Sequence, residues 1–251
     1  MRLLVSVANA DEARAALAGG ADVIDAKNPL AGPLGAVPVT ALREIQAAVA
    51  GARLLTAALG DAGDDAGIEN AASVFAAAGA ALVKVGFAGI TSASRVEALI
   101  KAAVRGARLA NGGVVAVGYA DADRVESLAA GALIDVAARA GAVGVLLDTA
   151  EKNGPGLREL MAPAALAAWV GAAHDAGLVA ALAGKLTADD LPFVREAGAD
   201  IAGVRGAACE GGRTGRVSAE RVAKLRTLGN PTEGGSHVRG TRRPPLDGPP
   251  A

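Results

Sequence analysis

Two lysine residues lie within short apolar segments that are typical of buried β-strands. Lys27 ends the run Val-Ile-Asp-Ala-Lys at residues 23–27, and Lys84 lies within Leu-Val-Lys-Val-Gly at residues 82–86. Burial of an ammonium group is costly unless the group is paired or loses its proton. A lysine with a lowered pKa is a nucleophile that attacks carbonyl groups and forms Schiff bases. The two lysines therefore predict carbonyl chemistry.

Carboxylates accompany these lysines. Asp25 lies two residues before Lys27, so the alternation of a strand places both side chains on one face. Asp148 ends another apolar run, and Lys152 follows it by four residues. Such carboxylates can hold an iminium charge or move protons at carbon. The alternative interpretation is that Asp25 with Lys84, and Asp148 with Lys27, are buried ion pairs that only fix the register of the strands. The sequence leaves open which lysine forms the imine.

Strand-like runs alternate with Ala-rich helical runs along the chain. Strands are predicted at residues 3–7, 23–27, 54–59, 82–86, 114–119, 144–148, 179–183 and 201–205. Helices are predicted between them at residues 10–19, 39–50, 68–79, 92–109, 131–140, 163–176, 188–197 and 218–228. This alternation is typical of a parallel sheet, and its length predicts an α/β fold, a single-domain (β/α)8 TIM barrel over residues 1–228.

An internal repeat favours the barrel over a doubly wound open sheet. Gly20, Gly79, Gly141 and Gly198 each end a helix and precede an apolar strand, at intervals of 57–62 residues. Each interval equals two βα units, so the repeat marks the even-numbered strands. These strands also carry the predicted catalytic residues, and the active site of such a barrel lies at the carboxyl ends of its strands. The residues are therefore expected to converge on one mouth.

A phosphate site is predicted in the loops that follow the seventh and eighth strands. Gly184 and Gly206 can let backbone N–H groups approach an anion, and Arg205 can add a bidentate contact. The alternative is that both glycines are only turn residues. Lys185 follows Gly184 and could simply be exposed to solvent.

Composition excludes several classes of protein. Hydrophobic residues make up 52% of the 251-residue chain and charged residues 20%, which indicates a globular protein. A net charge of −1 means that the chain lacks the excess of positive charge that is typical of nucleic-acid-binding proteins. The apolar runs are too short or too interrupted for a membrane span or signal peptide. The lone Cys209 excludes an internal disulfide and suits the cytoplasm.

No cofactor or metal is expected. No GxGxxG motif follows a strand, and His174 and His237 are too isolated to form a metal-binding cluster. The expected partner is a small-molecule phosphate, and a homo-oligomer is compatible with the sequence. Residues 229–251 contain five Pro and five Gly, so we expect them to form a disordered or loosely attached tail.

Several motifs together resemble the (5-formylfuran-3-yl)methyl phosphate synthases, also called 4-(hydroxymethyl)-2-furancarboxaldehyde-phosphate synthases. The resemblance covers about residues 2–228 and is carried by Leu3–Val7, Gly19–Pro29, Val83–Gly86, Gly118–Asp121, Leu146–Ala150, Ala180–Gly184 and Gly203–Cys209. Two features depart from the family pattern. The tail is not part of it, and Lys185 stands where a small residue is expected.

The resemblance implies an enzyme that condenses two molecules of glyceraldehyde 3-phosphate to a furan aldehyde phosphate, with loss of phosphate and water, for methanofuran biosynthesis. It implies that Lys27 is the Schiff-base lysine and that Lys84 accepts and donates protons. Asp25, Asp148 and Lys152 would be supporting groups in the same site. Two other functions compete: another class I Schiff-base aldolase acting on sugar phosphates, and a binding protein for phosphorylated metabolites that has no catalytic activity.

Overall fold

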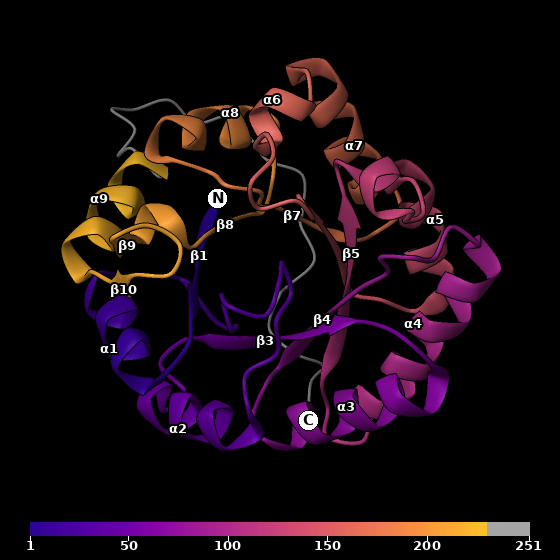
Figure 1. Ribbon diagram of the computed structural model, residues 1–251, viewed down its shortest axis with the longest axis horizontal. Coiled ribbons are helices and arrows are strands. Elements are labelled where there is room, and N and C mark those ends of the chain that lie inside the picture. The colour runs from indigo at the N-terminus through magenta and orange to yellow at the C-terminus, as the bar shows by residue number, and fades with distance from the viewer. Residues whose placement is uncertain (230–251) are drawn as a thin grey trace.

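Eight parallel strands close into a barrel at the centre of the molecule (Figure 1). In this computed structural model, residues 1–229 are described. The strands follow one another around the barrel in chain order: β1 (Arg2–Val7), β2 (Val23–Ala26), β3 (Leu54–Asp61), β4 (Leu82–Gly86), β5 (Gly113–Tyr119), β6 (Gly144–Asp148), β7 (Val179–Leu182) and β8 (Ile201–Val204). The predicted (β/α)8 barrel is thus confirmed.

A ring of helices surrounds the barrel, as Figure 1 shows. Its members are α1 (Ala10–Ala18), α2 (Val39–Val49), α3 (Asp65–Ala77), α4 (Ala93–Arg108), α5 (Ala130–Ala140), α7 (Pro163–Asp175), α8 (Leu191–Glu196) and α9 (Ala219–Gly229). Each corresponds to a predicted helix. Three-residue and four-residue 3-10 turns occur at Ala122–Val125 (η1), Ala188–Asp190 (η2) and Gly206–Ala208 (η3).

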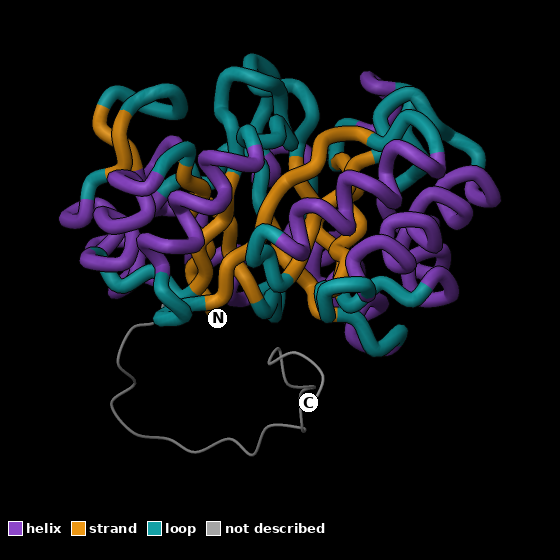
Figure 2. Tube along the Cα trace, turned by 90° about the horizontal axis from the view of Figure 1, so that it is seen from below, coloured by secondary structure: helices purple, strands orange, loops and turns teal. Residues whose placement is uncertain are grey.

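Two short elements at the mouth were not predicted. Helix α6 (Leu157–Leu160) lies in the loop after β6, and an antiparallel pair of strands, β9 (Cys209–Glu210) and β10 (Arg216–Val217), lies between β8 and α9. Each strand of this hairpin has two residues, too few to show the alternation that identifies a strand in sequence. In Figure 2 the hairpin and the long loops stand at the end of the barrel opposite to the N-terminus.

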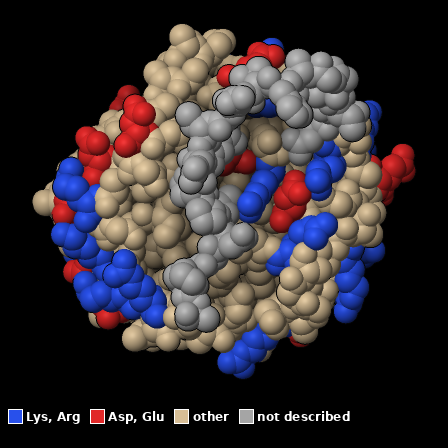
Figure 3. All heavy atoms as spheres, turned by 180° about the vertical axis from the view of Figure 1, so that it is seen from behind, with Lys and Arg blue, Asp and Glu red and all other residues tan. Residues whose placement is uncertain are grey.

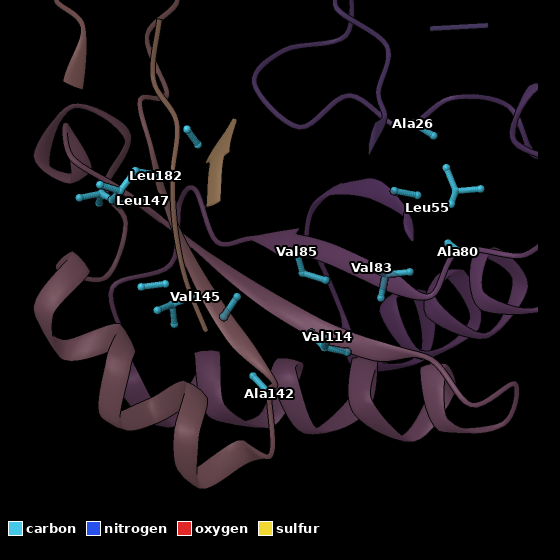
Figure 4. Close-up of a cluster of buried hydrophobic side chains, with 14 of the residues drawn as sticks. Ala26, Leu55, Ala80, Val83, Val85, Val114, Ala142, Val145, Leu147 and Leu182 are labelled. Atoms are coloured by element: carbon cyan, nitrogen blue, oxygen red, sulfur yellow. The ribbon is translucent and has the colours of Figure 1, made fainter. Parts of the chain in front are cut away.

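The main apolar core lies between the strands and the helices (Figure 4). Val83, Val85, Val114 and Val145 point outward from their strands into this layer and are completely buried. Alanine and valine make up much of it, and small side chains let helices approach the sheet closely. A smaller core fills the barrel itself, with members that include Leu4, Val117, Leu146 and Ile201.

The repeated glycines all have a positive φ. Gly20, Gly79, Gly141 and Gly198 have φ values of 82°, 104°, 81° and 85°. This left-handed region favours glycine because a Cβ atom would be strained there. Each of these residues turns the chain from the end of a helix into the next even-numbered strand.

The register of the strands determines which side chains share the interior. Ser6 of β1 pairs with Asp25 of β2, and Asp25 pairs with Thr56 of β3. On the other side of the barrel, Tyr119 of β5 pairs with Asp148 of β6. All of these side chains are buried. Three adjacent strands therefore deliver a carboxylate and two hydroxyl groups to one spot inside the barrel.

No helix among residues 1–229 is long and apolar enough to cross a membrane. Figure 3 shows the side of the molecule opposite to Figure 1, where Lys or Arg side chains lie next to Asp or Glu side chains around the rim.

Of the predicted tail, residues 230–251 lie outside the described residues. Gly229 is the last residue of α9.

The contact between α3 and α4 depends on Gly106. A Cβ atom at this position would lie 2.0 Å from the carbonyl oxygen of Glu69, a backbone atom that cannot turn aside. We expect Gly106→Ala to force the two helices apart and to lower the free energy of unfolding by about 1–3 kcal/mol. Urea denaturation measures the change.

Gly171 provides a matched control because it also lies inside a helix, α7, and a Cβ atom there would meet nothing within 4 Å. Gly171→Ala should stabilise the protein by up to about 1 kcal/mol, since alanine is the better helix former. Equal effects of the two substitutions would contradict the proposed role of the close helix contact.

Candidate active site

A cavity of about 520 Å³ opens at the carboxyl ends of the strands. Its walls include Lys27 directly after β2, Lys84 of β4, Asp148 of β6 and Lys152 in the loop after β6. Apolar side chains of the barrel interior, among them Leu146, form its floor. The structure thus brings together the lysines that the sequence singled out.

Asp25 and Lys84 form the deepest polar cluster. The Lys84 amine lies 2.6 Å from Asp25 Oδ1, and the side chains are 5% and 0% exposed. Ser6 donates a hydrogen bond to Asp25 Oδ2 (2.9 Å), and Thr56 donates one to Oδ1 (2.7 Å). The carboxylate is therefore surrounded by donors, which is what a buried charge requires. Lys84 is held at the cavity wall by this cluster.

Asp148 contacts the other two lysines. The Lys152 amine donates a hydrogen bond to Asp148 Oδ1 (2.9 Å) and another to the carbonyl oxygen of Thr149. The Lys27 amine lies 3.7 Å from Asp148 Oδ2, which is beyond hydrogen-bond distance. Within residues 1–229, no hydrogen bond is made by the Lys27 amine. Of Lys27, Lys84 and Lys152, Lys27 is thus held least tightly.

This environment lowers the pKa of Lys27 from 10.5 to about 8. Burial is the largest cause, and the neighbouring ammonium groups of Lys84 and Lys152 act in the same direction. The carboxylates of Asp148 and Asp25 oppose the shift. At pH 7 the neutral fraction of the Lys27 amine consequently rises from about 0.03% to about 10%. A neutral amine at this position can attack a carbonyl carbon.

Asp148 remains ionised in the same surroundings. Burial alone would raise the pKa of its carboxyl group, but the charges of Lys152 and Lys27, with hydrogen bonds from Lys152 and the Thr149 N–H, hold the pKa below its ordinary value. A carboxylate that stays ionised next to Lys27 can accept a proton from the amine or stabilise a cation formed on it.

Asp121 holds the loop that carries Lys152. One of its carboxylate oxygens accepts a hydrogen bond from the Ala150 N–H (2.7 Å), and the other accepts one from the Glu151 N–H (2.9 Å). Asp121 is itself buried, so these contacts are shielded from water. The backbone just before Lys152 is therefore fixed, and this directs the lysine back toward Asp148.

Gly184 and Gly206 both line the cavity. Gly184 has φ = 106°, and a Cβ atom there would lie 2.9 Å from Thr149 Cγ2. The position therefore requires glycine for its backbone and for the close approach of the loop after β6. Whether either glycine binds phosphate remains a prediction.

Arg205, which was predicted to bind phosphate, makes several hydrogen bonds within the protein. Its Nε and Nη atoms donate to Glu12, with which it forms a buried ion pair, and to the carbonyl oxygens of Ser6, Arg213 and Gly215. These contacts use all five N–H groups of the guanidinium. Arg205 lines the cavity but has no donor left for a phosphate, so we assign it to fixing the hairpin β9–β10 against β1 and α1.

Ser6, Thr56 and Arg213 were missed from the sequence. The alternation of their strands could have revealed Ser6 and Thr56, because both occupy inward-facing positions next to Asp25. No sequence signal distinguishes Arg213, which lies in the tip of the unpredicted hairpin. Within residues 1–229, no group of three or more His, Cys, Asp or Glu side chains could hold a metal ion.

The pKa of Lys27 can be tested without any substrate. Acetic anhydride labels only neutral amines, so the labelling rate of Lys27, followed by mass spectrometry, should reach half its maximum near pH 8. Asp148→Asn removes a carboxylate that raises this pKa, and the midpoint should move to lower pH. Asp123→Asn, at an exposed position outside the cavity, should leave it unchanged. A midpoint near 10 in the unmodified protein would contradict the assignment.

Solved structures resemble this fold. A 3-hexulose-6-phosphate synthase is 23% identical and aligns over 91% of this chain and 99% of its own, with a TM-score of 0.63. The deoxyribose phosphate aldolase of Aeropyrum pernix is 17% identical over 90% of this chain and 89% of its own, with a TM-score of 0.65. These similarities support the barrel architecture.

Sequence relatives are much closer. The (5-formylfuran-3-yl)methyl phosphate synthase of Methanocaldococcus jannaschii is 40% identical over 233 residues, which cover 91% of this chain and 99% of the relative. That of Methanopyrus kandleri is 42% identical over 229 residues, which cover 89% and 97%. A Streptomyces griseus protein described as a putative synthase of this type is 40% identical over 233 residues, which cover 90% and 93%. The model of the 4-HFC-P synthase family matches residues 3–226, and this chain therefore belongs to that family of enzymes.

Proposed function

We propose that this enzyme condenses two molecules of glyceraldehyde 3-phosphate to (5-formylfuran-3-yl)methyl phosphate through a Schiff base on Lys27. The observation that carries the proposal is the Lys27 amine, whose pKa is lowered to about 8 and which lies in the cavity with two other lysines and Asp148. Membership of the 4-HFC-P synthase family supports the choice of reaction. The resemblance described above implies that the product serves methanofuran biosynthesis.

The first step is the attack of the neutral Lys27 amine on the aldehyde carbon of one triose phosphate. The resulting carbinolamine loses water and becomes an iminium ion, whose charge lies near the Asp148 carboxylate. The iminium group withdraws electrons from the adjacent carbon, so a proton can leave that carbon and a carbon nucleophile forms. Asp148 therefore acts as a proton acceptor and as a counter-ion.

The second aldehyde is attacked by this carbon nucleophile. Lys84 lines the same cavity and is held by Asp25, and in this proposal it moves protons between the reacting carbon and oxygen atoms. Atoms balance when one phosphate and two molecules of water leave and a furan ring closes. Formation of the aromatic ring favours the last steps, and the reaction consumes no oxidant or reductant.

Reductive trapping tests the Schiff base. Incubation with glyceraldehyde 3-phosphate and sodium borohydride should add the mass of the reduced imine to the peptide that contains Lys27. Lys27→Arg should retain the fold, form no adduct and lose at least about a thousandfold in turnover, because a guanidinium cannot form the imine.

Lys101→Arg is the control for the trapping experiment, since Lys101 is exposed on α4 and pairs with Glu97. This variant should form the adduct at the rate of the unmodified protein. An adduct that persists in Lys27→Arg would move the imine to another lysine, and no adduct in any variant would favour the non-catalytic binding protein.

The products distinguish the synthase from another aldolase. With glyceraldehyde 3-phosphate as the sole substrate, the enzyme should release one inorganic phosphate for every furan chromophore that forms. Lys84→Gln should still form the adduct on Lys27 but lose about 10²–10⁴ in the rate of furan formation, as expected for removal of a general acid–base. Condensation without release of phosphate would instead indicate a simple aldol reaction.

A further inference from the structure

The cavity has an unequal distribution of charge. Seven basic side chains line it, and Asp148 is the single acidic residue among its lining residues. The seven are Lys27, Lys84, Lys152, Lys185, Arg205, Arg213 and Arg221. The first three form ion pairs with only two carboxylates, Asp25 and Asp148, and Arg205 forms an ion pair with Glu12. Lys185, Arg213 and Arg221 form no ion pair with any residue in the range 1–229.

Of these three cations, Arg213 is the one whose side chain makes the most hydrogen bonds. It lies at the tip of the β9–β10 hairpin and donates hydrogen bonds from its two Nη atoms to the carbonyl oxygens of Pro29 and Gly32 (2.7 Å for Gly32), in the loop that follows Lys27. These contacts hold the guanidinium in place and leave its Nε–H and one N–H on each Nη atom free. Partial burial lowers the pKa of this guanidinium, although the charge of Asp148 acts to raise it.

Two further cations, from other elements, line the same cavity. Arg221 lies in the first turn of α9 and lines the cavity together with Gly206 and Ala207. Lys185 follows Gly184 with φ = 59°, a left-handed conformation that is costly for a residue with a side chain. Its amine donates a hydrogen bond to the carbonyl oxygen of Gly154, which still leaves two donors.

A purely structural role does not explain this arrangement. Two hydrogen bonds are enough to tie the hairpin to the loop after β2. They leave the charge of the half-buried Arg213 without a counter-ion, which is costly. An anion from solution would supply the missing charge. A guanidinium fork, an ammonium group and a second guanidinium lining one cavity suit a tetrahedral dianion that can accept several hydrogen bonds at once.

We propose that Arg213, Arg221 and Lys185 form a subsite for a phosphate monoester at the outer mouth of the cavity, separate from the reacting amines. The identification of this monoester as the substrate's own phosphate rests on the proposed function. The subsite then orients a triose phosphate with its phosphate toward the hairpin and its aldehyde toward Lys27. The subsite supplies the phosphate contact that the sequence had predicted for Arg205, because the N–H donors of Arg205 are all occupied.

Titration with inorganic phosphate tests the subsite without any chemistry. Isothermal calorimetry at low ionic strength should show that Arg213→Lys and Arg221→Gln each weaken phosphate binding by about tenfold or more, because one loses the fork and the other a charge. Arg221 makes no hydrogen bond or ion pair in the described part of the chain, so Arg221→Gln should leave the fold intact. Thermal melting checks the fold of Arg213→Lys.

Arg216→Gln is the matched control. Arg216 lies in the same hairpin, is exposed and does not line the cavity, so this variant should bind phosphate as the unmodified protein does. Equal affinity in all four proteins, or an equal loss in Arg216→Gln, would overturn the proposal. Preferential loss in Arg213→Lys and Arg221→Gln supports it.

Trapping with borohydride separates this proposal from the catalytic one. With unphosphorylated glyceraldehyde, Arg221→Gln should form the Lys27 adduct at the unmodified rate, whereas with glyceraldehyde 3-phosphate it should need about tenfold more substrate. An equal defect with both aldehydes would place Arg221 in the chemistry and contradict the subsite. Absence of an adduct in the unmodified protein would refute the Schiff base but leave the phosphate titration as an independent result.

Discussion

Three ammonium groups share two carboxylates inside this barrel, and the behaviour of the site follows from that imbalance. Asp25 is committed to Lys84, with Ser6 and Thr56 completing its hydrogen bonds. Asp148 is committed to Lys152 at 2.9 Å, and Lys27 remains 3.7 Å away without a hydrogen bond. In a shielded environment the surplus charge is relieved most easily by loss of a proton, and the lysine with the weakest partner loses it. The two tight pairs thus make the third amine a nucleophile.

The barrel makes such a charge cluster tolerable. Parallel strands β2, β4 and β6 contribute residues from widely separated parts of the sequence, and hydrogen bonding around the closed barrel fixes their positions. The polar residues lie above an apolar floor. The buried Asp121 carboxylate holds the loop that carries Lys152 through two hydrogen bonds. Replacing buried ion pairs by apolar groups is often neutral or stabilising, so several such pairs in one cavity point to chemistry more than to stability.

Much of this arrangement could be predicted from the sequence, for definite reasons. Apolar runs and repeated glycines identify the strands and their even-numbered members, and alternation along β2 places Asp25 and Lys27 on one face. Both suggested ion pairs, Asp25–Lys84 and Asp148–Lys27, are present. The choice between the lysines could not be predicted, because it depends on distances across the barrel. The hydrogen bonds of Arg205 could not be predicted for a related reason: its partner Glu12 is 193 residues away, and the hairpin that supplies two of its acceptors has strands too short to recognise.

The contact between Glu12 and Arg205 joins α1 to the residue directly after β8, so the first and the last βα units of the barrel depend on each other. During synthesis on the ribosome, Lys27 emerges long before β4, β6 and β8. In that unfinished chain its amine is hydrated, far from the other lysines, and protonated like any surface lysine. Only closure of the ring withdraws water and brings the neighbouring charges near. The lowered pKa of the Lys27 amine is therefore acquired together with the complete fold, and a partly made chain lacks the neutral amine that the proposed Schiff base requires.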